Sequence, residues 1–130
     1  YCVTVSIENV EFLQPVEVGD LVSFYASVNY VGKSSLVVGM KVVAENVKMG
    51  TARHTNSSYF TMVAKGDDNK TAKVPELVLE EEIEVRRFLE ALKRKEFSAA
   101  FRDRMQDVKS AFSRKDMALL SQERCVVGFN

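Results

Sequence analysis

The sequence predicts an α+β domain, in which an antiparallel sheet of four strands is followed by C-terminal helices. Apolar and polar residues alternate with a period of two over roughly the first 64 residues, and after Pro75 the period changes to 3.6. The connections between the predicted strands are too short for crossover helices. Consecutive strands are therefore expected to run antiparallel.

The four strands are predicted at about residues 1–10, 21–31, 36–47 and 51–64. Alternation puts one set of apolar side chains of each strand on a common face. In the first three strands these sets are Val3, Val5 and Ile7, then Val22, Phe24, Ala26, Val28 and Tyr30, then Leu36, Val38, Met40, Val42 and Ala44. Such a sheet has one apolar face that needs a cover.

Turn residues separate the strands. Gly19-Asp20 ends the first interruption, Gly32-Lys33-Ser34-Ser35 joins the second strand to the third, and Lys48-Met49-Gly50 leads into the fourth. Glycine accepts positive φ, and serine hydroxyls bond back to the backbone of a turn. The segment 32–35 is therefore predicted to close a tight hairpin.

Two helical blocks are predicted in the rest of the chain. Their apolar residues recur at helical spacing, at Ile83, Val85, Phe88, Leu89 and Leu92 and at Phe101, Met105, Val108 and Phe112. Ser98 is suited to cap the second block, although Lys93–Glu96 could equally continue one long helix. We expect residues 1–75 to form the sheet domain and residues 76–130 a helical C-terminal extension.

Composition narrows the class of protein. The 130 residues are 46% hydrophobic, and 18 Lys and Arg balance 18 Asp and Glu, so no global field attracts nucleic acid or an anionic membrane. Cys2 and Cys125 fit no metal or redox spacing, and no apolar run approaches the ~20 residues of a membrane helix. A cytoplasmic protein with free thiols is expected. The start at Tyr1, without Met, is what a processed, disordered or truncated N-terminus leaves.

Three motifs point to a family. They are FLQPVEVGD at 12–20, GKSS at 32–35 and RHTNSSYFTMVAK at 53–65. Together they resemble the hotdog-fold acyl-CoA thioesterases, the bacterial acyl-CoA hydrolases and their cytosolic animal relatives, over roughly Tyr1 to Pro75. The motifs are specific in combination and weak singly.

The resemblance implies a hotdog-type sheet and the hydrolysis of fatty acyl-CoA to free fatty acid and CoA in the complete protein. It also implies that the family's first strand and central helix precede Tyr1. The family's mechanism uses a carboxylate as general base or nucleophile and a helix N-terminus for the oxyanion. Both would come from that preceding segment, so the catalytic residues are unknown and this chain alone is expected to be inactive.

Coenzyme A carries a diphosphate, a 3′-phosphate and an extended pantetheine arm. Its binder needs cations or oriented N–H groups for the phosphates and a strand edge for the amides of the arm. The 32–35 turn offers such groups, although it also reads as a plain hairpin turn. The resemblance implies contacts with CoA at Val5, Ser6, Ile7, Lys33, Ser34 and Ser35.

A second basic element is Arg86-Arg87. This pair resembles a basic pair that follows the last strand in the relatives, where an arginine reaches the nucleotide end of CoA. The alternative is a solvated helix face on which these arginines pair with Glu82 and Glu84.

His54 is the only histidine of the chain. It has no Ser, Cys or carboxylate at a telling spacing, so a structural role is the first interpretation and a place in the substrate pocket, for His54 or Asn56, is the second. No metal site and no cofactor is expected.

The expected partners are acyl-CoA or CoA and further copies of the chain, as a dimer or a trimer of dimers. Neither nucleic acid nor a membrane is expected as a partner. The alternative function is a non-catalytic hotdog module that binds acyl-CoA or a nucleotide as a regulator, and a third reading is a purely structural oligomer. Acyl chain length cannot be predicted from these residues.

Overall fold

The structure is a computed structural model that describes residues 1–129. Its internal contacts divide the chain into two compact units, Tyr1–Leu92 and Lys93–Asn130, and each is described by itself. The division predicted from the sequence, between a sheet domain to residue 75 and a helical extension after it, stays a prediction.

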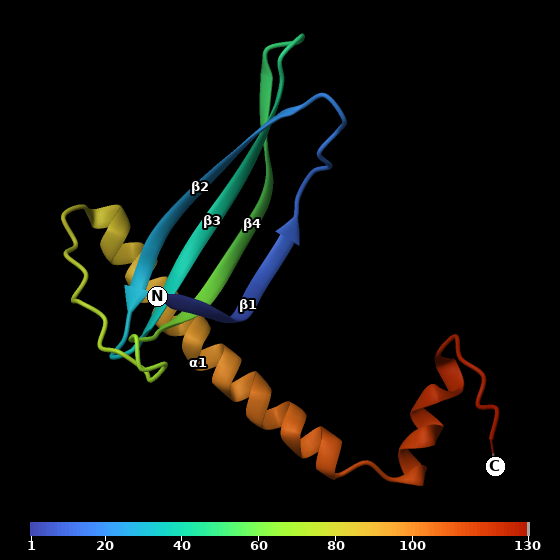
Figure 1. Ribbon diagram of the computed structural model, residues 1–130. Coiled ribbons are helices and arrows are strands. Elements are labelled where there is room, and N and C mark those ends of the chain that lie inside the picture. Colours follow the sequence, from blue (N-terminus) through green and yellow to red (C-terminus); the bar gives the residue numbers. More distant parts are fainter. Residues whose placement is uncertain (130) are drawn as a thin grey trace. The chain divides into compact units, whose positions relative to one another are not determined.

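The first unit contains the four predicted strands. They are β1 (Cys2–Phe12), β2 (Leu21–Val31), β3 (Ser35–Asn46) and β4 (Thr51–Ala64), and their ends lie within two residues of the predicted ones. All neighbours are antiparallel, in the order β1-β4-β3-β2 (Figure 1). The predicted sheet is confirmed, and β1 and β2 form its two edges.

An extra residue in β2 changes which face Tyr30 occupies. Val28 pairs with Val38 and Tyr30 pairs with the adjacent Val37, so Asn29 between them has no partner in the register. Directly paired residues share a face, and neighbours along a strand take opposite faces. The expectation that Tyr30 shares the face of Val28 was therefore wrong, because the irregularity at Asn29 reverses the alternation.

The register defines an apolar face of the sheet. Its members are Val22, Phe24, Ala26 and Val28 of β2, Leu36, Val38, Met40, Val42 and Ala44 of β3, and Phe60 and Met62 of β4. Val42 and Ala44 are buried, but Phe24 is 66% exposed and Val28 is 42% exposed. Part of this apolar face is therefore open to solvent in the described residues.

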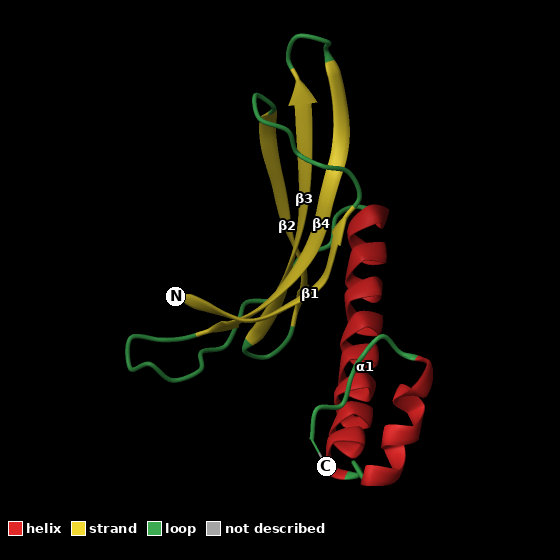
Figure 2. Cartoon of the chain, turned by 90° about the vertical axis from the view of Figure 1, so that its right-hand side faces the viewer, coloured by secondary structure: helices red, strands yellow, loops and turns green. Residues whose placement is uncertain are grey.

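The opposite face contacts the beginning of α1 (Glu82–Ser110). The rings of Tyr30 and Phe88 lie 5.0 Å apart between centroids, and Ala91 is buried. Figure 2 shows the four strands as one twisted layer, with the helices in red. Of the two possibilities left open by the sequence, the structure has one continuous helix over residues 82–110. Ser98 therefore lies within it and caps no second helix.

The second unit consists of the rest of α1 and a 3₁₀ helix, η1 (Arg114–Gln122). The Ser113 N–H donates to the Asp116 carboxylate at 2.8 Å at the start of η1. Aromatic side chains of this unit are exposed, including Phe97, Phe101 and Phe112. No helix among the described residues is long and apolar enough to cross a membrane.

The two units carry opposite net charge. Residues 1–92 contain nine Lys and Arg against thirteen Asp and Glu, whereas residues 93–130 contain nine against five. The balanced total charge of the chain therefore conceals an acidic sheet unit and a basic helical unit.

Candidate functional site

The 32–35 turn is closed by a backbone hydrogen bond, and little space is left beside Gly32. The Gly32 N–H donates to the Ser35 carbonyl at 2.8 Å. A Cβ on Gly32 would lie 2.9 Å from Ser35 Oγ and 3.3 Å from the Tyr30 hydroxyl. The positive-φ glycines of the described chain are Gly19 and Gly50. The hairpin is therefore confirmed, but Gly32 has no positive φ, and a side chain there would crowd the hydroxyls of Ser35 and Tyr30.

The turn is held by the chain that follows β4. The Ala64 N–H donates to the Ser34 carbonyl at 2.8 Å, and the Val74 N–H donates to the Lys33 carbonyl at 2.9 Å. The carbonyl groups of Lys33 and Ser34 are thereby held in place, while the Lys33 side chain is exposed. A cation on a fixed backbone is suited to an anionic ligand.

The structure places the predicted contacts on β1 at the same end of the sheet as this turn. Val63 of β4 pairs with Ser35 on one side and with Val3 on the other. Val5–Ile7 follow directly along β1, and the register shifts at Val5. Because one strand separates β1 from β3, Ser35 and Val3 lie roughly 10 Å apart across the sheet, and Val5–Ile7 lie further along β1 by roughly 3.3 Å per residue. An extended ligand can span that distance.

Arg86 and Arg87 lie near the start of α1, and no described contact joins them to the turn. Arg86 Nε lies 3.6 Å from the Glu90 carboxylate, so its partner is one turn later in the helix and not Glu82. Arg87 lines a shallow cleft together with Glu84, at the edge formed by β2 and residues 77–79. Their contact with CoA stays a prediction.

The Glu84 side chain binds backbone N–H groups just before the start of α1. Its Oε2 accepts the N–H groups of Glu80 at 2.7 Å and Glu81 at 3.0 Å. These backbone bonds lower the pKa of the Glu84 carboxyl, and the nearby Arg87 charge lowers it further. Glu82 and Glu84 thus lie in the first turn of the helix, and the Glu84 carboxylate is bound by backbone donors.

His54 is held within β4. Its Nε2 lies 2.9 Å from the Asn56 carbonyl oxygen and 2.8 Å from Ser57 Oγ. His54 pairs with Val43 and Asn56 with Val42, so Thr55 is an extra residue and the two side chains take opposite faces. The Asn56 Oδ1 atom is buried and accepts no described hydrogen bond. A role for either residue in a pocket stays a prediction.

The contact of Ser57 with His54 is one that sequence reasoning missed. Residues three apart on a regular strand face opposite sides, so their spacing gave no signal. The extra residue Thr55 brings them together, and its hydroxyl donates to the Val42 carbonyl at 3.2 Å.

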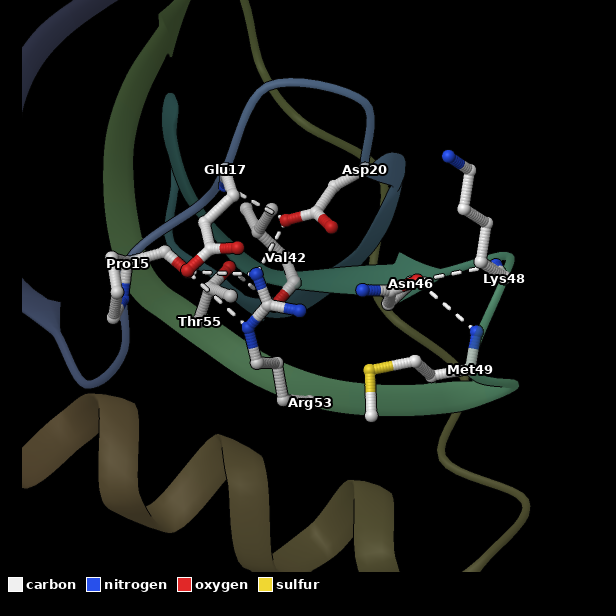
Figure 3. A network of polar contacts seen from close by, with 9 residues as sticks. All are labelled: Pro15, Glu17, Asp20, Val42, Asn46, Lys48, Met49, Arg53 and Thr55. Atoms are coloured by element: carbon white, nitrogen blue, oxygen red, sulfur yellow. Dashed lines mark hydrogen bonds and ion pairs between the residues drawn. The ribbon is translucent and has the colours of Figure 1, made fainter.

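A second polar network fixes the segment between β1 and β2 (Figure 3). Arg53 pairs with Asp20 and donates to the Pro15 carbonyl at 3.0 Å through Nη2 and at 3.3 Å through Nε. The Asp20 carboxylate also accepts the Glu17 N–H at 2.8 Å. This backbone bond, followed by the Arg53 guanidinium, lowers the pKa of Asp20.

The network has a structural role. The Asp20 side chain is 4% exposed, and the Arg53 donors are bonded to Asp20 and to Pro15. Gly19-Asp20 was expected only as a turn, and Arg53 as the partner of Asp20 was not found from the sequence. Within residues 1–129, no group of three His, Cys, Asp or Glu side chains could hold a metal ion.

The comparisons with known proteins point to one family. The thioesterase superfamily matches residues 1–51. Protein VdlD of Helicobacter pylori is 47% identical over 100 residues, which are 74% of this chain and 57% of that protein. The chain thus spans a little more than half the length of this curated relative.

Solved structures of acyl-CoA hydrolases and thioesterases resemble the chain. The acyl-CoA hydrolase of Bacillus cereus has a TM-score of 0.74 at 31% identity, over 86% of this chain and 68% of that one. The acyl-CoA hydrolase of Staphylococcus aureus, in complex with butyryl-CoA and CoA, has 0.72 at 30%, over 84% and 66%. A hexameric acyl-CoA thioesterase has 0.69 at 29%, over 86% and 67%. Because the chain resembles these proteins in sequence and in the fold of its sheet, it belongs to the hotdog-fold acyl-CoA thioesterase family.

Proposed function

We propose that the complete protein is an acyl-CoA thioesterase that hydrolyses fatty acyl-CoA to a free fatty acid and CoA. The observation that carries the proposal is the likeness to the B. cereus acyl-CoA hydrolase, at 31% identity over 86% of this chain. The positions of the 32–35 turn and Val5–Ile7 add support, because they offer a cation on one strand connection and a strand edge two strands away.

The carboxylate and the oxyanion donors of the reaction belong, in this proposal, to a segment outside residues 1–130. The open part of the apolar face supports this, because Phe24 and Val28 are exposed where a sheet normally packs against a helix. The central helix of the complete protein would cover these residues. The chain spans only 57% of the length of VdlD, which is consistent with that view.

The complete protein is further proposed to work in the cytoplasm as an oligomer. Both cysteines are free and exposed, as suits a reducing compartment. The edge strands β1 and β2 each leave one side without a described neighbour, and such edges are usually paired or covered.

Hydrolysis is tested by incubating the purified full-length protein with a series of fatty acyl-CoAs and measuring the free thiol released. Turnover of at least one acyl-CoA is expected, and residues 1–130 alone should release no thiol above background. Tight binding of acyl-CoA by the full-length protein without release would instead favour the regulatory binding module. Turnover by residues 1–130 would place catalytic groups within this chain.

A further inference from the structure

Lys73 lies beside Lys33 in the fold, although 40 residues separate them in the sequence. The Val74 N–H belongs to the peptide group that follows Lys73, and it donates to the Lys33 carbonyl at 2.9 Å. Hydrogen-bonded neighbours of this kind have Cα atoms roughly 5 to 6 Å apart. Two lysine side chains therefore leave the backbone at nearly the same place.

The position of Lys73 is fixed by more than one bond. The Ala64 N–H donates to the Ser34 carbonyl at 2.8 Å, and the Ala72 N–H donates to the Ala64 carbonyl at 2.9 Å. Lys65 and Thr71 form an antiparallel bridge between these contacts. The segment from β4 to Val74 thus folds back on itself and lies against the 32–35 turn.

The two lysines are exposed, and neither takes part in a described ion pair among residues 1–129. The nearest acidic residue in the sequence is Glu76, three residues after Lys73; it is exposed and forms no described ion pair among residues 1–129. Asp68, in the turn of this segment, accepts the Lys70 N–H at 3.1 Å. Two lysines whose backbones are adjacent can bring both ammonium groups to one ligand. An anion with two negative charges would be attracted by both of them.

We propose that Lys33 and Lys73 together bind a phosphate group of the nucleotide end of CoA. The inference rests on the proposed function for the identity of the ligand, while the lysine pair itself rests on the geometry. A phosphate accepts hydrogen bonds from two ammonium groups at once, and lysine binds phosphate as a point charge on a flexible stem. The hydroxyls of Ser34 and Ser35 adjoin the same turn.

The test is calorimetric titration of the full-length protein with CoA, with 3′-dephospho-CoA and with adenosine 3′,5′-bisphosphate. Lys33→Ala and Lys73→Ala should each weaken binding of CoA about tenfold, as for loss of a charge-assisted bond. Both should also flatten the dependence of affinity on salt. Lys73→Arg should retain most of the affinity. Lys41→Ala, which removes an exposed lysine in the middle of β3, is the matched control and should bind like the wild type.

The ligand series identifies the phosphate. If the effect of Lys73→Ala disappears with 3′-dephospho-CoA, the pair holds the 3′-phosphate, and if it persists, the pair holds the diphosphate. Equal affinities of the wild type and Lys73→Ala for all three ligands would overturn the inference.

Failure of the inference and failure of the proposed function can be told apart by the results of these experiments. A wild type that hydrolyses acyl-CoA, with Lys73→Ala binding CoA equally well, would reject the lysine pair alone. A wild type that binds adenosine 3′,5′-bisphosphate through Lys73 but hydrolyses no acyl-CoA would reject the thioesterase function alone. If the wild type binds none of the three ligands, the proposed lysine pair is rejected, whether or not acyl-CoA is hydrolysed.

Discussion

Single side chains decide how the strands of this sheet fit together. Asn29, the extra residue of β2, is buried and lies over Gly39 of the neighbouring strand. Its Oδ1 accepts the Ser27 hydroxyl at 2.8 Å. A Cβ on Gly39 would lie 2.3 Å from the Asn29 amide nitrogen, so only glycine leaves room for this side chain.

We expect Gly39→Ala to lower the free energy of unfolding by about 1 to 3 kcal/mol, because the buried amide must move and lose its fit. Urea unfolding followed by circular dichroism measures the change. Gly128→Ala is the control, since a Cβ there meets no atom within 4 Å. Equal unfolding free energies for the two variants would show that Asn29 moves without cost.

Asp20 should make stability depend on acid pH. Its folded-state pKa is lowered, first by the Glu17 N–H and then by Arg53, so the carboxylate stabilises the fold above the unfolded-state pKa of about 3.9. That contribution is lost as the pH falls through the folded-state value.

We therefore expect the free energy of unfolding to fall less steeply below about pH 4 in Asp20→Asn than in the wild type. Urea unfolding at a series of pH values from 6 to 3 checks this. Some fall should remain, because the Glu84 pKa is lowered as well. Asp67→Asn, in an exposed turn, is the control, and parallel curves for wild type and Asp20→Asn would contradict the expectation.

At the scale of the elements, α1 is anchored to the sheet by few side chains. Phe88 contacts Tyr30, and Ala91 is buried, whereas Phe101 of the same helix is 68% exposed. Phe88→Ala should cost about 2 kcal/mol of unfolding free energy, less than for a fully buried ring because Phe88 is half-buried. Thermal and urea unfolding measure it.

Phe101→Ala makes the same substitution at an exposed position, so its cost should stay within about 0.5 kcal/mol. A cost for Phe101→Ala equal to that of Phe88→Ala would mean that its ring is covered in the protein in solution.

The strands could be predicted almost to the residue, because alternation and turn chemistry act over a few neighbouring positions. The irregularities at Asn29 and Thr55 could not be predicted, because an extra residue leaves the local composition unchanged and is stabilised by the partner strand. The continuity of α1 was left open, since Lys93–Glu96 are good helix formers without an apolar signal.

The candidate site was predictable only in part. The motif at 32–35 marked the turn, but Lys73 lies in a segment without periodicity. Its approach to Lys33 is set by backbone bonds that any sequence can make. Ser57 was missed beside His54 for a similar reason, because its contact depends on Thr55.

At the scale of the whole molecule, we expect self-association. The edges β1 and β2 and the open part of the apolar face are surfaces that folded proteins usually cover. Light scattering at micromolar concentration should give at least twice the mass of one chain. A monomer mass with a folded circular dichroism spectrum would contradict this expectation.

The opposite charges of the two units should govern how the protein behaves during purification. At neutral pH the whole chain, with 18 basic and 18 acidic side chains, should be held weakly by ion exchangers of either sign. The acidic unit of one molecule can attract the basic unit of another in dilute buffer, so added salt should raise the solubility instead of lowering it. Proteolysis between Leu92 and Lys93 would separate a fragment that an anion exchanger retains from one that a cation exchanger retains.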